Sequence, residues 1–315
     1  MSRERVWIAT VNGLDGNGKM GKAINLGYDK GVAMGLSMDS ENRFTMAFRE
    51  YSGGNVPHTI NEINRLGPEA GERIYSLLVP PRILEMFRIN PKTLCNAAGE
   101  KVVRVTSHPD LTFATIEVRE RPEDQDCIFF LEIEDTPLYK IEINFLIIND
   151  PTSPRFNTDV DELGRRTKFA TVRRNIPEEI RAMEAGLAPG QVRRGLRMLR
   201  DFVPIATEFI KALEQDMVIA EPLTYSSAIL LEYYGFNYIR GKRKMEEIHR
   251  GFQPGGELYR KLDGSTPFRR PGMERTVRGR AWAIHDGILG EPWRGIEMYR
   301  TEKPANVCTF PGWVY

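Results

Sequence analysis

Residues 101–148 read KVVRVTSHPDLTFATIEVRERPEDQDCIFFLEIEDTPLYKIEINFLII and carry the clearest secondary-structure pattern of the chain. Apolar and polar residues alternate within them, most regularly between Tyr139 and Ile148, as expected for strands with one buried and one wet face. The turns between the runs are too short to hold helices, so the pattern predicts an antiparallel meander. The four predicted strands are 102–106, 112–118, 127–133 and 139–148.

The segments on either side of this meander have mixed patterns. Residues 39–51 alternate like a further strand, and Asn175 with Glu178 resembles the capping box at the start of a helix. Between 192 and 213, apolar residues recur at spacings of three and four, with Pro204 expected to kink or divide the helix. The predicted helices are 59–66, 69–78, 176–185 and 192–213.

Together these elements predict an α+β fold, with an antiparallel β-rich N-terminal half and a mainly helical C-terminal half. The chain of 315 residues exceeds a comfortable single core, which favours two domains. We expect a β-rich domain with an antiparallel sheet at 1–150 and a connecting segment at 151–174. A mainly helical domain with a long irregular C-terminal segment is expected at 175–315.

Composition excludes several classes of protein. With 41% hydrophobic and 28% charged residues the chain is ordinary globular, and a formal net charge of +1 provides no field to attract nucleic acid. No run of about 18 apolar residues predicts a membrane span. Three cysteines far apart in the sequence fit free thiols in a reducing compartment. We expect a soluble cytoplasmic protein with a small-molecule substrate and no nucleic-acid or membrane partner; the sequence indicates no oligomeric state.

A glycine-rich segment, NGLDGNGKMGKA at 12–23, fits three interpretations. The letters GLDGNGK resemble the phosphate loop of thymidylate-kinase-type proteins, although Met20 stands where a hydroxyl should hold magnesium. The letters GNGKMG at 16–21 resemble the dinucleotide-binding fingerprint of nicotinamide oxidoreductases. A hairpin turn explains the same letters, because Asn-Gly and Asp-Gly are turn dipeptides.

Two further segments share a resemblance. Residues 188–199 read APGQVRRGLRML, and residues 227–236 read SAILLEYYGF. The first resembles the acyl-CoA phosphate loop of the GNAT acyltransferase superfamily, and the second is similar to a later helix of that superfamily ending in Gly-Phe. The resemblance implies a CoA-dependent acyltransferase that holds the nucleotide between Gly190 and Gly195. The chain departs from the pattern at Arg197, where a glycine is usual, and at Leu231, where the tyrosine acting as general acid usually stands.

Two sections carry opposite charge. Residues 165–200 hold ten Lys or Arg against three Glu, and residues 117–142 hold nine acids against three basic residues. The two sections either meet or are separately solvated. A sharper interpretation is that the arginines line the approach to a site for a phosphate or carboxylate substrate.

The stretch MVIAEPLTYSSAILLEYYGFNYIRGKRKMEEIHRG at 217–251 is interpreted as a helix cluster. Glu246 and His249 are three apart in a polar run that predicts a helix, so the carboxylate and imidazole would project from one face. Later in the chain, Asp286 follows His285 directly within a segment dense in arginine and glycine. Such a pair can ligate a metal or serve as acid and base, or can simply be structural.

One hypothesis unites these residues: an enzyme that acts on a small anionic molecule by metal-assisted or general acid-base chemistry in the C-terminal half. His249, His285 and Asp286 would be catalytic, and with Glu246 they would be candidate ligands of a divalent metal. Arg269 and Arg280 would bind the substrate's charge. The alternatives are a cofactor-using enzyme, either a CoA-dependent acyltransferase or a nicotinamide oxidoreductase, and a non-catalytic ligand-binding or assembly protein.

Overall fold

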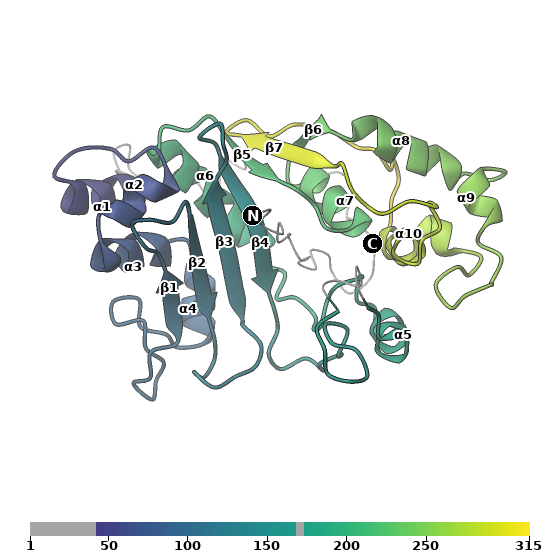
Figure 1. The fold of residues 1–315 in the computed structure, drawn as a ribbon, viewed down its shortest axis with the longest axis horizontal. Coiled ribbons are helices and arrows are strands. Elements are labelled where there is room, and N and C mark those ends of the chain that lie inside the picture. Colours follow the sequence, from purple (N-terminus) through teal and green to yellow (C-terminus); the bar gives the residue numbers. More distant parts are fainter. Residues whose placement is uncertain (1–41, 168–172) are drawn as a thin grey trace, which may run out of the picture.

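The computed structural model describes residues 42–167 and 173–315, which form one seven-stranded sheet with helices packed on it (Figure 1). The glycine-rich segment at 12–23 lies outside the described residues. The strands are β1 (Val103–Thr106), β2 (Phe113–Val118), β3 (Phe129–Asp135), β4 (Ile141–Ile148), β5 (Met217–Ala220), β6 (Asn237–Arg240) and β7 (Glu297–Thr301). The helices are α1 (Arg43–Ser52), α2 (Ile60–Arg65), α3 (Pro68–Ser76), α4 (Pro81–Met86), α5 (Ile176–Glu184), α6 (Leu199–Ala212), α7 (Tyr225–Tyr233), α8 (Lys242–Gly251), α9 (Glu257–Arg260), the 3₁₀ helix η1 (Met273–Arg275) and α10 (Val277–His285).

The sheet is mixed, with strand order β1-β2-β3-β4-β5-β7-β6. The predicted meander of 101–148 is confirmed, since β1 to β4 pair with their chain neighbours in antiparallel fashion. The prediction of a wholly antiparallel sheet is wrong, because β4 and β5 run parallel. Helix α6 lies in the connection between them, as a parallel pair requires a crossover rather than a hairpin.

The C-terminal half contains more strand than its sequence indicated. It contributes β5, β6 and β7, so the fold is a mixed α and β structure whose sheet draws on both halves of the chain. Strand β5 has only four residues, MVIA, of which the last three are buried, and so it has no alternation to signal a strand. The division into two domains stays a prediction; strands from both predicted parts belong to this one sheet.

The segment predicted as a strand at 39–51 is largely the helix α1. Asn42 caps it, because its side chain accepts a hydrogen bond from the backbone N–H of Phe44 at 2.9 Å. Phe44, Ala47 and Phe48 are its buried residues, at the spacing of one helix face. An alternating run this short fits both periods, and packing decides between them.

Helices of the N-terminal half and α6 pack on the same face of the sheet. Phe44 of α1 meets Phe209 of α6 edge-to-face with ring centroids 5.2 Å apart, and Phe202 of α6 lies 5.9 Å from Phe129 of β3. In Figure 1, β1 to β4 stand in front of α4 and α6. The result is one continuous apolar core that includes residues of both halves.

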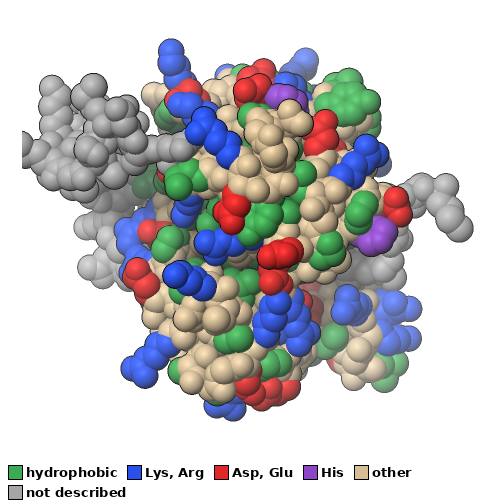
Figure 2. All heavy atoms as spheres, turned by 90° about the vertical axis from the view of Figure 1, so that its left-hand side faces the viewer, with side chains coloured by type: hydrophobic (Ala, Val, Ile, Leu, Met, Phe, Trp, Pro, Cys, Tyr) green, Lys and Arg blue, Asp and Glu red, His purple; other side chains and the backbone are tan. Residues whose placement is uncertain are grey.

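One face of the molecule carries intermixed charges. Figure 2 shows acidic and basic side chains interspersed on the face that lies at the left of Figure 1, without a large region of one sign. The three cysteines are free thiols. Among residues 42–167 and 173–315, no helix is long and apolar enough to cross a membrane.

We predict that Phe209→Ala lowers the free energy of unfolding by about 3–5 kcal/mol, because it removes a buried ring that joins α6 to α1. Denaturant titration with probes from both halves measures this. A single shifted transition is expected, because the core is continuous. Leu138→Ala, at a side chain 81% exposed, is the control and should change little. Two separate transitions, only one of them shifted, would support the two-domain division instead.

Candidate functional site

The edge of β4 that faces β5 is paired over only part of its length. The parallel register joins Ile141 to Val218, Glu142 to Ile219 and Ile143 to Ala220, and there it stops. In the part of the chain that the structure describes, no strand continues this pairing along 144–148. In Figure 1, β4 runs on downward while β5 turns away across the top of the molecule. Beyond Ile143 the two strands are no longer paired among the described residues, and we call this unpaired side of 144–148 the gap.

A β-bulge marks the place where the strands separate. The register between β3 and β4 shifts between Glu132 and Ile133, so that Glu132 faces Phe145 while Ile133 faces Ile143. Asn144 is thereby the extra residue of β4, and bulges of this kind bend a strand and increase its twist. The bulge lies directly after Ile143, the last residue of β4 that pairs with β5.

A narrow apolar cavity, which we call the slot, lies beside this gap between α6 and α7. Its volume is about 40 Å³, where one water needs about 10–15 Å³. A longer chain of atoms therefore fits only if α6 and α7 move slightly apart. Polar groups are few: Thr207, Ser227 and Arg300. The other lining residues are Ile143, Leu146, Leu199, Phe202, Val203, Ala206, Val218, Ala220, Leu230, Leu231 and Phe236.

One end of the gap is closed by the loop that leads into α6. The backbone N–H of Leu196 donates to the carbonyl of Ile148 at 3.3 Å, and that of Asp150 donates to Arg194 at 2.8 Å. Gly195 thus bridges to Asn149 just beyond β4. The chain leaves the sheet at 150 and returns beside the same residue, so 150–194 is an insertion between β4 and α6.

Helix α6 begins at this loop without a capping side chain. Met198 is its N-cap residue, and no side chain there accepts a hydrogen bond from the first turn. Free N–H groups and the helix dipole make such an end attractive to anions. Arg197, just before the cap, has a φ of 59°, the left-handed region that favours glycine. The loop therefore adopts a backbone shape usual for glycine, although it carries an arginine.

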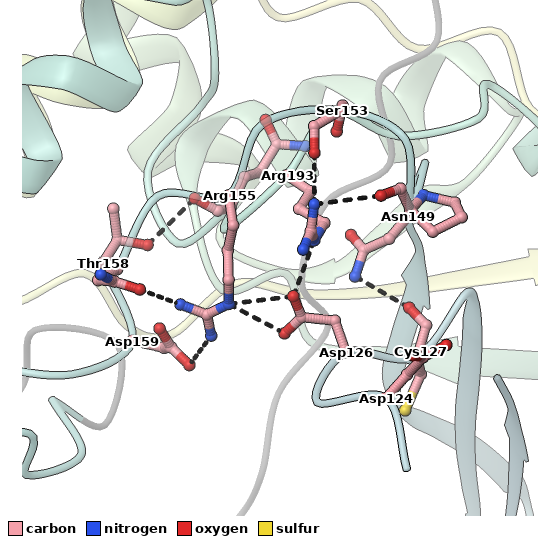
Figure 3. Close-up of polar contacts among 12 residues, drawn as sticks. Asp124, Asp126, Cys127, Asn149, Ser153, Arg155, Thr158, Asp159 and Arg193 are labelled. Carbon is pink, nitrogen blue, oxygen red and sulfur yellow. Dashed lines mark hydrogen bonds and ion pairs between the residues drawn. The ribbon is translucent and has the colours of Figure 1, made fainter. Parts of the chain in front are cut away.

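A polar network anchors the loop to the sheet (Figure 3). The Asp126 carboxylate, just before β3, accepts from Arg193 Nε at 2.8 Å and from Arg155 Nε at 3.0 Å. Arg193 also donates to the backbone carbonyls of Pro151 and Ser153. One carboxylate thus ties the start of the insertion and the α6 loop together. The acidic section 117–142 and the basic section 165–200 therefore meet at the contact between Asp126 and Arg193. Nothing in the sequence distinguishes Asp126 from the other acidic residues of its section.

His249 of α8 and Arg280 of α10 are brought together. His249 Nδ1 lies 3.2 Å from Arg280 Nη1, and since a guanidinium only donates, Nδ1 must accept. Arg280 is 2% exposed and lies over the Phe310 ring at 3.4 Å, so it acts here as a buried cation. Burial and then the charge of Arg280 lower the pKa of His249. Glu246 is exposed on the same helix.

His285 and Asp286 belong to a second cluster. His285 Nε2 lies 3.5 Å from a carboxylate oxygen of Glu179, a residue that is 2% exposed. Asp286 accepts from Arg174 Nη1 at 2.9 Å and from Arg269 Nε at 2.9 Å. Thus Arg269 neutralises a carboxylate of the chain itself. These contacts join α5 of the insertion to the end of α10.

The predicted residues therefore fall into two clusters with different partners. Within residues 42–167 and 173–315, no group of three or more His, Cys, Asp or Glu side chains is placed to hold one metal ion. The metal-assisted and acid-base roles of Glu246, His249, His285 and Asp286 stay predictions. Comparison of the chain with family models, curated proteins and solved structures finds no match.

We predict that Asp126→Asn destabilises the fold by about 1–3 kcal/mol, because two half-buried arginines lose their shared charged acceptor. Denaturant titration measures the loss. The matched control is Asp216→Asn, which removes an exposed ion pair with Lys140 and should cost less than about 1 kcal/mol. Equal effects of the two variants would contradict the anchoring role of Asp126.

His249 predicts a pH dependence of stability. Its folded-state pKa is lowered, so the unfolded chain takes up the proton at a higher pH than the folded protein does. The free energy of unfolding therefore falls as pH drops through the pKa of the unfolded histidine, and this fall ends below the folded-state pKa. His249→Gln should flatten the fall in unfolding free energy between about pH 7.5 and about pH 5.5. His108→Gln, at a side chain 64% exposed, is the control. An unchanged pH profile in His249→Gln would show that the Arg280 contact does not govern this titration.

Proposed function

We propose that the protein is an acyltransferase that takes its acyl group from a thioester of CoA. The observation that carries the proposal is the early end of the β4–β5 parallel pairing beside an apolar slot. Among the described residues no strand pairs with β4 on this side beyond Ile143, so a linear amide-containing chain can bind here as an added strand would. Pantetheine is a chain of this kind, and the uncapped start of α6 supplies an anion site at one end of the gap.

The segments that resemble the GNAT superfamily occupy the positions this function needs. Residues 188–199 form the loop before α6, and residues 227–236 form most of α7 and the turn after it. Arg197 stands where the superfamily usually has a glycine, but its backbone adopts the positive φ that glycine favours, so the loop can keep the same backbone shape.

The departure at Leu231 changes the chemistry that we propose. Leu231 lies on the slot wall and cannot donate a proton to a departing thiolate. Ser227, one turn earlier on the same helix, also lines the slot and is within 2.9 Å of the Thr224 hydroxyl. We assign to Ser227 the task of donating a hydrogen bond to the leaving sulfur.

The other slot residues bind and orient. The apolar walls exclude water from the thioester, which would otherwise hydrolyse it. Main-chain groups of the second half of β4 would align the pantetheine amides and the thioester carbonyl along the strand. The acceptor, an amine or hydroxyl, forms a bond to the acyl carbon as the carbon–sulfur bond breaks, and the proton that it loses converts the departing thiolate into the thiol of CoA.

We expect acetyl-CoA to stabilise the protein. At a free concentration about 100 times Kd the unfolding free energy should rise by about 2.7 kcal/mol, measured by thermal or denaturant unfolding. NADH at the same concentration is the control and should have no effect. Stabilisation by NADH alone would favour the nicotinamide alternative instead.

The slot itself is tested by Val203→Trp, which fills the space between α6 and α7 with an indole. Affinity for acetyl-CoA, measured by calorimetry, should fall at least about tenfold, a loss of about 1.4 kcal/mol. Val203→Ile, which adds one methylene, is the matched control and should bind nearly as well. Wild-type affinity in a folded Val203→Trp protein would exclude the slot as the binding site.

A further inference from the structure

Three arginines converge beside the start of α6. Arg194 and Arg197 belong to the loop before the helix, and Arg278 comes from α10, far along the chain. Arg194 Nη2 donates to the carbonyl of Ala185 at 3.1 Å. Arg278 Nη1 lies against the next residue, 3.2 Å from the position of a β-carbon on Gly186. Two guanidinium groups therefore meet at Ala185 and Gly186, next to the loop that carries the third.

The three charges have no acidic partner. In the described residues none of Arg194, Arg197 and Arg278 forms an ion pair, and the buried Nε of Arg278 has no hydrogen-bond acceptor. Arg278 instead stacks on the Tyr315 ring at 4.7 Å. Burial lowers the pKa of Arg278, and the neighbouring charges of Arg194 and Arg197 act in the same direction. The buried Nε of Arg278 is costly without an acceptor, and the exposed charges of Arg194 and Arg197 add repulsion that a bound anion would relieve.

A structural role accounts for part of this arrangement. The C-terminal end of α5 carries a partial negative charge, and the Ala185 carbonyl accepts from Arg194. That interaction uses one donor of one guanidinium. Among the described residues it leaves Arg197 without an acidic partner and Arg278 with a buried unsatisfied Nε, so capping of α5 does not explain why three arginines gather here.

We propose that Arg194, Arg197 and Arg278 bind a phosphate monoester, which on the CoA donor is the 3′-phosphate of the ribose. The inference rests on the proposed acyltransferase function and adds a determinant of donor specificity. A dianionic monoester suits several guanidinium groups, which donate paired hydrogen bonds to phosphate oxygens. The uncapped start of α6 is left for the pyrophosphate, so the two phosphate groups have separate sites on adjacent elements.

The test compares CoA with 3′-dephospho-CoA, which differ only in this phosphate. Calorimetry on the full chain should give at least about tenfold tighter binding of CoA, consistent with the strength of charge-assisted hydrogen bonds. Arg278→Gln should reduce this preference to near unity without weakening dephospho-CoA. Arg200→Gln is the control, because Arg200 is 68% exposed nearby and lies 3.9 Å from Asp201. It should keep the preference.

A second variant covers the case in which Arg278→Gln fails to fold. Arg197→Gly relieves a strained backbone and removes an exposed charge, so the folded protein should be at least as stable and should lose most of the preference. Equal affinity of the wild type for the two nucleotides overturns this inference but leaves the acyltransferase proposal standing. Binding of neither nucleotide overturns the acyltransferase proposal, and with it the 3′-phosphate assignment.

Discussion

The parallel pairing of β4 with β5 over three residue pairs is the constraint on which the rest of the candidate site depends. At one end the pairing stops beside the bulge at Asn144; at the other, Gly195 returns to β4 beside Asn149. Among the described residues no strand pairs with this side of β4 between these two points. The slot, the loop and the start of α6 are placed by these two fixed points, and Asp126 holds the second of them through Arg193.

The fold was predictable where the local pattern has one interpretation. Strands β2 to β4 alternate clearly because one face packs on helices and the other is half-exposed. Strand β5 is four residues long with both faces largely buried, and so its letters fit a helix as well. Residues 43–52 alternate by coincidence, and the packing of Phe44 and Phe48 selects the helix. The pairing of strands far apart in the sequence, such as β5 with β7, cannot be recognised from the residues of either strand alone.

The sequence marked the candidate site only in part. The segment around Gly195 resembles an acyl-CoA phosphate loop, which stays a prediction, and Arg197, where that pattern has a glycine, adopts a positive φ. Spacing could not reveal that Arg278 lies against Gly186, since α10 is brought there only by tertiary packing. The same limit affected the histidines: His249 of α8 and His285 at the end of α10 contact Arg280 and Glu179 respectively, and neither partner is marked by sequence spacing.

The insertion at 150–194 has its own small apolar cluster, in which Phe156, Ala182 and Leu187 pack against Phe268 and Trp282. Its two ends leave and rejoin the sheet at adjacent residues, so its length is not fixed by the geometry of the strands. The main core and this cluster share none of their buried residues. Changes in the length of this segment are therefore expected to leave the pairing of the strands intact while they alter the surroundings of the loop before α6.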